Sequence, residues 1–200
     1  MNFERVISYD IELSTPILDR EPDDPPPYDY AVGWKDYQRM KIACLASPTV
    51  AECLGNVTGK NLYRTSIYFS GQNLRNAEFY LNQYDLLISF NGLAFDQNVM
   101  RANGIFSNVA EYDLLHEWKK ATGKRVSLGD LSCANLAGVG KSGNGADAPM
   151  KWIRGQYQEV IEYNFDDTIL VARLFALVLK NGQLINPRDG KLVRLPEPNT

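Results

Sequence analysis

Four acidic residues stand in three short runs, two of which lie in or beside strongly apolar segments, where acidic side chains are unexpected. Asp10 and Glu12 lie in the run SYDIEL. Asp96 ends the run SFNGLAFD, and Asp167 ends the run EYNFDD. A strand places alternate side chains on one face, so Asp10 and Glu12 point in the same direction. Neighbouring carboxylates repel each other unless a cation bridges them or one is protonated. Hard divalent cations take oxygen ligands, so the pattern predicts a two-metal site that hydrolyses phosphodiesters.

Two of these acids have informative neighbours in the sequence. Asp96 follows the Asn91-Gly92 turn at the end of an apolar strand, where the ligands of α/β sheets collect. Its alternative role is that of a dipole partner in the first turn of a helix. Tyr163 precedes Asp167 by four residues on an expected helix, so the two share a face. The alternative for this pair is a tyrosine–carboxylate hydrogen bond that only closes the helix face.

The periodicity of apolar residues predicts the elements that position these side chains. Strands are expected at residues 5–13, 39–47, 62–69 and 85–90. Helices are expected at residues 73–83, 93–102, 112–121, 127–137 and 157–180. Strands come early and helices late, so the expected fold class is α/β, with a mixed central sheet flanked by helices. Asp166, one position round the last helix from Asp167, is expected to face solvent.

The chain has the length of one domain, which is expected over residues 1–180. Residues 181–200 form a C-terminal tail whose Asn-Gly and Asp-Gly dipeptides predict a small hairpin. A loop over residues 15–30 contains five prolines and leaves directly from the first two acids. Two interpretations of this loop stay open: it borders a substrate groove, or it is a mobile acidic insertion.

Other features of the chain limit its chemistry. The run AGVGKSG resembles a Walker A loop but has Asn135 where the first glycine is required, so a flexible loop is expected. His116 is the only histidine, which removes histidine triads and histidine-based metal sites. A basic cluster either contacts phosphates or complements a helix dipole. It comprises Lys119, Lys120, Lys124 and Arg125.

The composition is ordinary for a globular chain, with 44% hydrophobic and 22% charged residues. The net charge is −3, but 24 acidic residues less the four proposed ligands leave twenty against 21 basic ones, which does not exclude a nucleic-acid substrate. This balance argues against tight duplex binding through a basic face. Three cysteines without a CxxC spacing fit a reducing compartment. With no membrane-spanning run and no signal peptide, we expect a cytoplasmic location, in the host cytoplasm if a virus encodes the chain.

Taken together, SYDIEL, FNGLAFD and EYNFDD resemble the three motifs of the DEDD superfamily of 3'-5' exonucleases, which has a ribonuclease H-like fold. The third motif resembles the tyrosine form found in the proofreading domains of family A and family B DNA polymerases. The histidine form would need a histidine where Glu162 stands. The segment from Asp113 through SLGDLSCANLAG to a lysine and a Gly-rich loop resembles predicted nucleases of this superfamily. The resemblance covers residues 5–178, although the loop after the first strand is longer than usual.

The resemblance implies a metal-dependent 3'-5' exonuclease that acts on the 3' end of single-stranded DNA or RNA. Two Mg²⁺ or Mn²⁺ ions would be held by Asp10, Glu12, Asp96 and Asp167. One ion would activate a water molecule and the other would stabilise the leaving 3'-oxygen. Tyr163 would orient the attacking water. The terminal nucleotide would contact Leu13, Asn91 and Phe95.

Two alternatives remain at this stage. The same four ligands would serve a structure-specific endonuclease on the same fold. A catalytically silent module that binds nucleic acid or protein would also keep the fold. The presence of all four acids argues against the silent module, and the lack of a large basic patch argues against a purely binding role.

Overall fold

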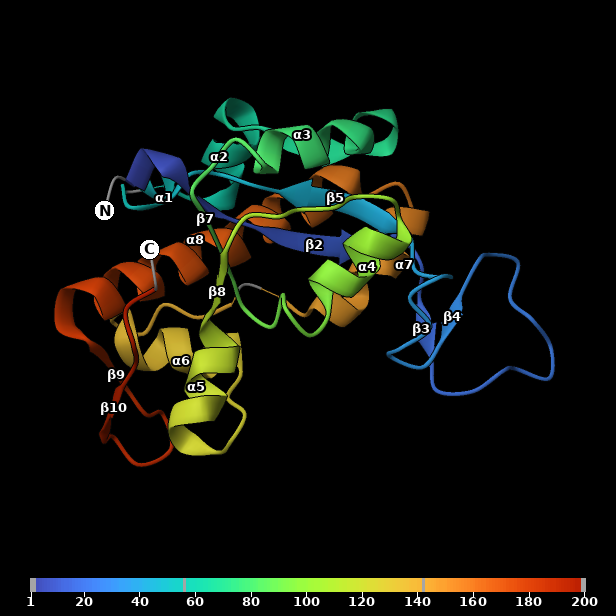
Figure 1. Cartoon of the computed structure of the whole chain (residues 1–200). Helices are drawn as coiled ribbons and strands as arrows, with labels where there is room; N and C mark the ends of the chain where they lie inside the picture. Colours follow the sequence, from blue (N-terminus) through green and yellow to red (C-terminus); the bar gives the residue numbers. More distant parts are fainter. Residues whose placement is uncertain (1–2, 56, 142, 199–200) are drawn as a thin grey trace.

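A computed structural model describes residues 3–55, 57–141 and 143–198 of the chain (Figure 1). Its central sheet consists of β1 (Val6–Ser8), β2 (Asp10–Leu13), β5 (Ile42–Ala46), β6 (Tyr68–Ser70), β7 (Leu86–Ser89) and β8 (Glu111–Asp113). β1 pairs in parallel with β7, and β7 pairs in parallel with β8. β2 pairs antiparallel with β5, and β5 with β6. The expected mixed sheet is therefore confirmed.

One long strand joins the parallel and antiparallel parts of this sheet. β1 and β2 are separated only by Tyr9, so they run on as a single strand, as the apolar pattern over residues 5–13 predicts. The strand order is therefore β6, β5, β1/β2, β7 and β8. This central position places the side chains of β2 at the middle of the sheet, where both faces are covered.

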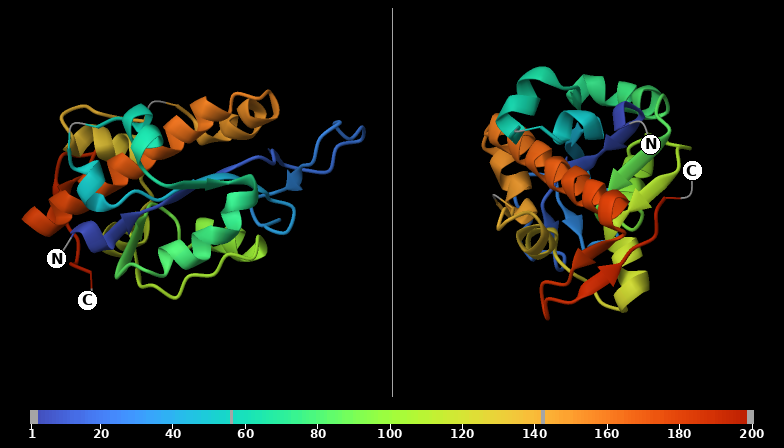
Figure 2. Two further views of the ribbon diagram at one scale, coloured as in Figure 1. Left: turned by 90° about the horizontal axis from the view of Figure 1, so that it is seen from above. Right: turned by 90° about the vertical axis from the view of Figure 1, so that its left-hand side faces the viewer.

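Helices cover both faces of the sheet. They are α1 (Val50–Cys53), α2 (Gly59–Thr65), α3 (Ala77–Leu81), α4 (Asp96–Ala102), α5 (Leu114–Thr122), α6 (Leu128–Asn135), α7 (Ala148–Ile153) and α8 (Tyr157–Asn181). Figure 2 shows α8 against one face and α3 and α4 against the other. Side chains alternate along each strand, so Val6 and Ile88 join the core under α8, whereas Ile7 and Leu87 join the core under α3 and α4. None of the described helices is long and apolar enough to cross a membrane.

The segment expected as a strand at residues 62–69 is the main error of the sequence interpretation. Gly59–Thr65 is the helix α2, and only Tyr68–Ser70 is a strand. The Thr58 side chain caps α2, and Asn61 Oδ1 accepts a hydrogen bond from Thr58 N, which completes a capping box. Asp166 Oδ1 also accepts a hydrogen bond from Gly59 N at 2.6 Å, so the expectation that Asp166 faces solvent is wrong.

Several short elements are absent from the sequence prediction, among them β8 and α7. β8 occupies the start of the helix expected over residues 112–121, so that α5 begins only at Leu114. α7 (Ala148–Ile153) lies between the Gly-rich loop and α8. Both elements are too short to show a period of their own, and each is fixed by contacts with distant parts of the chain.

The loop after the first strand is an arm (residues 14–41) that joins β2 to β5. Within it, β3 (Ile17–Leu18) and β4 (Ala31–Val32) pair in parallel, although the arm has the high proline and acid content of a disordered loop. Figure 1 shows the arm projecting from one end of the sheet. Residues 15–30 are therefore mostly irregular, as expected, but the β3–β4 pairing joins the start of that segment to the residues that follow its end.

The C-terminal tail packs against the rest of the chain. β9 (Gln183–Ile185) and β10 (Leu192–Arg194) form an antiparallel hairpin. Leu184 and Leu195 are buried in the core under α8. Asn135 of α6 exchanges two hydrogen bonds with the backbone of Ile185, so this hairpin is held by polar contacts as well.

A buried carboxylate secures the turn that leads into α4. Asp113 is 2% exposed and caps α5, accepting hydrogen bonds from the backbone N–H groups of Leu115 and His116. The same carboxylate accepts hydrogen bonds from Asn91 N at 2.8 Å and Leu93 N at 3.2 Å. Asp113 thus fixes the turn that precedes Asp96 as well as the start of α5.

We expect Asp113→Ala to destabilise the protein more than the loss of an ordinary helix cap. The substitution removes the cap of α5 and leaves the Asn91 N–H without its acceptor, at a combined cost of about 2–4 kcal/mol. Ser127→Ala, which removes the exposed cap of α6, is the control and should cost about 1 kcal/mol. Urea unfolding measures both. Equal losses in the two variants would show that Asp113 is only a cap.

Candidate metal centre

Strand β2 delivers the first two acids to one face of the sheet. Asp10 and Glu12 alternate with Ile11 and Leu13, which join the core under α3 and α4. Asp10 is half-buried, and Glu12 is 7% exposed. The carboxylates therefore face α8, which packs against β2 and β5.

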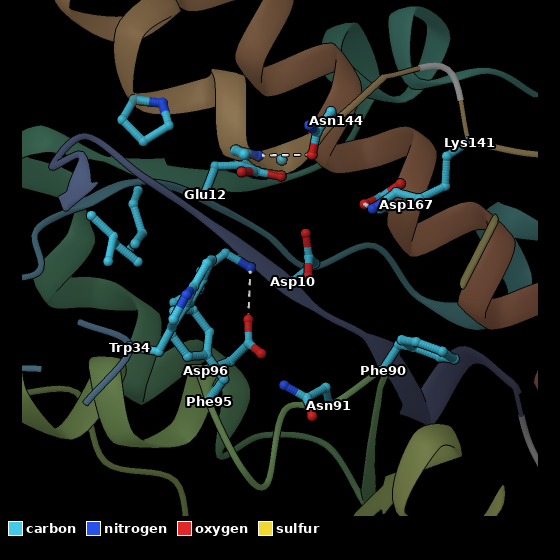
Figure 3. Close-up of a pocket in the computed structure, with 16 residues that line it drawn as sticks. Asp10, Glu12, Trp34, Phe90, Asn91, Phe95, Asp96, Lys141, Asn144 and Asp167 are labelled. Carbon is cyan, nitrogen blue, oxygen red and sulfur yellow. Dashed lines mark hydrogen bonds and ion pairs between the residues drawn. The ribbon is translucent and has the colours of Figure 1, made fainter. Parts of the chain in front are cut away.

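Helix α8 brings the third acid to the same place. Ligand oxygens of Asp10, Glu12 and Asp167 all lie within 4.8 Å of one another, although Asp167 is remote in sequence (Figure 3). Asp167 is only 4% exposed. Tyr163 lies one turn earlier on α8, and a Cβ added to Gly145 would lie 3.7 Å from both the Tyr163 hydroxyl and the Glu12 carboxylate, so the two groups border the same space. The expected common face of Tyr163 and Asp167 is thus present.

Asp96 reaches this site from the other side of β2. It is the first residue of α4, is 6% exposed and accepts a hydrogen bond from Ile11 N at 3.3 Å. It lines the same pocket as Asp10, Glu12 and Asp167 but lies outside the group whose oxygens are within 4.8 Å. The structure therefore gathers three of the four proposed ligands tightly and places the fourth on the wall of their pocket.

The pocket around these acids has a volume of about 430 Å³. Its wall includes Leu13, Asn91 and Phe95, the three residues expected to contact the terminal nucleotide. Asn91 has a left-handed backbone, with φ of 77°, at the turn held by Asp113. The acids thus stand in a cavity that also carries aromatic and amide groups.

The crowding of acids raises their pKa values. Burial, followed by the charges of Asp96, Glu12 and Asp167, raises the pKa of Asp10 well above its ordinary value. Burial and the Asp167 charge do the same for Glu12. Burial and the nearby Glu111 raise the pKa of Asp96 to about 7. The pKa of Asp167 is also raised, chiefly by burial. These groups resist being ionised together, which is the condition that a bound cation relieves.

A lysine that the sequence interpretation assigned to a flexible loop occupies this site. Lys141 Nζ lies 2.5 Å from Asp167 Oδ2 and 5.2 Å from the centre of the Tyr163 ring. Burial lowers the pKa of Lys141, but the interactions with Asp167 and Tyr163 together raise it by more. Its position in a Gly-rich loop before the last helix was the only sequence signal, because the contact itself depends on how the loop folds.

The donor set of the pocket fits a divalent metal ion. The second oxygen of Asp167, Oδ1, is buried and accepts no hydrogen bond from any described residue. Burying such an oxygen costs folding free energy unless a cation or a water molecule binds it. Three convergent carboxylates that include this buried, unbonded oxygen suit a divalent cation such as Mg²⁺ or Mn²⁺, which prefers oxygen ligands.

Asn164 holds the first acid in place. Its Nδ2 donates to Asp10 Oδ2 at 2.7 Å, and its Oδ1 accepts from Ala46 N at 2.7 Å. Asn164 is fully buried, so these bonds fix the position of Asp10 relative to both α8 and β5. The sequence does not indicate this role, because it depends on contacts of Asn164 with the distant strands β2 and β5.

Behind Asp96, a polar network stiffens the wall of the pocket. Glu111 accepts hydrogen bonds from Tyr9 Oη at 2.9 Å, Ser89 Oγ at 2.5 Å and Gln97 Nε2 at 2.8 Å. Gly92 packs so tightly against this network that an added Cβ would collide with three of its atoms. Gly92 is therefore required here for space, which explains the Asn-Gly turn.

The basic cluster is dispersed, with one member near the pocket. Arg125 Nη2 lies 3.4 Å from Asn91 Oδ1, a long contact on the pocket rim. Lys120 pairs with Glu117 on the surface of α5, and His116 is exposed. The helix-dipole interpretation accounts for Lys119 and Lys120, which lie in the last turn of α5, but not for Arg125.

Neither a known protein family nor a curated protein matches the sequence of this chain. Among solved structures, the family B DNA polymerase from the hyperthermophilic archaeon Pyrobaculum calidifontis is similar, with a TM-score of 0.57 and 15% identity. The match covers 87% of this chain but only 24% of the polymerase chain. At this identity the likeness shows the fold alone. Together with the strand order, it defines a ribonuclease H-like α/β fold.

The raised pKa values predict that the metal-free protein loses stability as the pH rises. A carboxyl group whose folded pKa exceeds its unfolded value of about 4 contributes stability below that value and loses it as the pH rises through the folded pKa. With the pKa of Asp96 at about 7, the free energy of unfolding in EDTA should fall between about pH 4 and pH 7.

Urea unfolding across this range measures the pH dependence. Asp96→Asn should reduce the fall in the free energy of unfolding with pH. Asp85→Asn, which removes an exposed ion pair with Arg5, should leave that fall unchanged. Saturating Mn²⁺ should remove the fall in the free energy of unfolding, because metal binding favours the ionised acids. A stability that rises with pH in EDTA would contradict the electrostatics of this site.

Proposed function

We propose that this protein is a metal-dependent 3'-5' exonuclease that hydrolyses phosphodiester bonds from the 3' end of single-stranded DNA or RNA. The observation that carries the proposal is the convergence of Asp10, Glu12 and Asp167, with their ligand oxygens within 4.8 Å of one another. Asp96 lies on the wall of the same pocket. Within the proposal, residues 1–180 form the nuclease domain, and the protein acts in the cytoplasm.

Two likenesses support this function. The sequence motifs resemble those of DEDD exonucleases, including the proofreading domains of family B DNA polymerases. The fold is similar to part of a family B DNA polymerase. The four acids of these motifs line one pocket of that fold. Agreement between motifs and fold is stronger support than either likeness alone.

In this proposal, Asp10, Glu12, Asp96 and Asp167 hold two Mg²⁺ or Mn²⁺ ions. Such ions lower the pKa of a bound water and stabilise the charge on the leaving oxygen. Asn164 and Lys141 keep the Asp10 and Asp167 carboxylates in position. Leu13, Asn91 and Phe95 contact the terminal nucleotide from the pocket wall.

Tyr163 orients the attacking water in the proposed reaction. Burial, followed by the Asp167 charge, raises the pKa of its hydroxyl above the ordinary value near 10. The phenol therefore stays protonated at neutral pH and offers a hydrogen bond without acting as a base. Its place one helical turn before Asp167 brings the hydroxyl to the edge of the acid cluster.

Digestion of end-labelled single strands tests the function. We expect matched DNA or RNA strands to shorten stepwise from the 3' end in Mg²⁺ or Mn²⁺, and to stay intact in EDTA. Asp10→Asn should abolish hydrolysis, because it removes a ligand charge while an amide oxygen can still accept the Asn164 hydrogen bond. The melting temperature of the metal-free variant should hold or rise as repulsion is relieved, and its stabilisation by metal should shrink.

The product pattern separates the alternatives. Internal cuts without stepwise loss from the end would indicate the endonuclease. Binding without cleavage under all metal conditions would indicate the silent module. Wild-type activity in Asp10→Asn would overturn the metal site itself.

We expect Tyr163→Phe to slow hydrolysis without eliminating it. The loss should match that of one positioning hydrogen bond, on the order of ten- to a thousandfold in rate. Metal affinity should barely change, because the ring supplies no ligand. Single-turnover hydrolysis with a parallel metal titration measures both. A full wild-type rate would assign Tyr163 to packing, and a collapse in metal binding would contradict its assigned place on α8.

A further inference from the structure

The arm carries an exposed tryptophan to the rim of the pocket. Trp34 lines the pocket, and its ring lies edge-on to Phe95, with centroids 5.8 Å apart and an interplanar angle of 61°. The Tyr37 ring is also edge-on to Phe95, with the ring centroids 6.3 Å apart. Figure 3 shows Trp34 and Phe95 on one side of the pocket and Lys141 and Asp167 on the other.

Backbone contacts at the base of the arm set the position of Trp34. Ala31 N donates to Pro16 O, and Gly33 N donates to Leu18 O. These hydrogen bonds hold the β3–β4 pair together as far as Gly33, the residue before Trp34. Asp36 Oδ2 accepts a hydrogen bond from Val32 N at 3.0 Å and closes the following turn. Trp34 is therefore presented by a bonded part of the arm.

The other side of this segment is anchored in the core. Met40 is fully buried, and its carbonyl oxygen accepts a hydrogen bond from Asn103 Nδ2 at 2.9 Å. Tyr37 Oη contacts the carbonyl oxygen of Ala94 at 3.4 Å, which links the arm to the turn before α4. The segment that bears Trp34 is thus held at both ends against the wall of the pocket.

The exposure of Trp34 is unusual for its size. The residue is 62% exposed, whereas Trp118 is 2% exposed in the core. A large aromatic group left in water beside a pocket that contains carboxylates is suited to cover an apolar surface of a ligand. A nucleotide has such a surface in its base, and its phosphate would reach the acids across the pocket.

We propose that Trp34 stacks on the unpaired base of the 3'-terminal nucleotide, so that the arm selects single-stranded ends. This inference rests on the proposed function and adds a base-binding residue to it. Stacking on an aromatic side chain tolerates every base and contributes about 1–3 kcal/mol. The terminal base of a duplex end is paired and stacked on its neighbour, and it would have to leave both to reach Trp34.

The charge of the arm favours the same substrate. Residues 15–30 contain five acids and one arginine, a net charge of −4. A second strand laid along this segment would bring phosphates against those acids. The arm would thus repel a duplex while Trp34 attracts a single unpaired base.

Equilibrium binding tests the stacking role apart from hydrolysis. Fluorescence anisotropy in Ca²⁺ would compare a labelled DNA strand that ends in a normal nucleotide with the same strand ending in an abasic nucleotide, and an RNA pair likewise. The wild type should prefer the normal end by on the order of ten- to a hundredfold. Trp34→Ala should lose this preference, and Trp34→Phe should keep part of it. Phe79→Ala, at an aromatic residue 76% exposed outside the pocket, is the matched control and should bind like the wild type.

The outcomes separate this inference from the proposed function. Equal binding of the normal and abasic ends by the wild type, or an unchanged preference in Trp34→Ala, would overturn the stacking role. Failure of the wild type to bind either strand would overturn it as well. A preference that depends on Trp34, without hydrolysis in Mg²⁺ or Mn²⁺, would preserve the stacking role and reject the exonuclease.

Discussion

Mutual repulsion among buried carboxylates is the constraint on which the rest of this structure depends. Asp10, Glu12 and Asp167 share one small volume, and burial makes the charged form of each more costly. No isolated strand or helix would hold them together. The sheet and α8 do so because both are buried along much of their length, and that apolar burial offsets the electrostatic cost.

The polar groups around the acids distribute this cost over several elements. Asn164 ties Asp10 to α8 and β5, and Lys141 brings a positive charge from the Gly-rich loop. Behind Asp96, the Glu111 network and Asp113 hold the turn and the neighbouring strand. Each support comes from a different segment of the chain, so the site forms only when the whole domain has folded.

Local periodicity predicted the elements that carry the acids, but not the loops that complete the site. The strand at 5–13 and the helix at 157–180 have strong periods of their own, so the fold class and the shared face of Tyr163 and Asp167 followed from the sequence. The segment of helix α2 resembles a strand because Tyr63, Ile67 and Phe69 fit an alternating pattern, while its Thr58–Asn61 capping box has asparagine in place of the usual glutamate or glutamine. Lys141, Asn164 and Trp34 act through long-range contacts that no local pattern encodes.

The hydrogen bonds that steady the acids also limit what they can offer to a metal ion. Asn164 engages one oxygen of Asp10, Lys141 one oxygen of Asp167, and Ile11 N one oxygen of Asp96. An octahedral cation would find fewer protein ligands here than four carboxylates suggest, and would have to complete its shell with water or phosphate oxygens. Occupancy by metal and by nucleic acid would therefore be thermodynamically linked, each raising the affinity for the other.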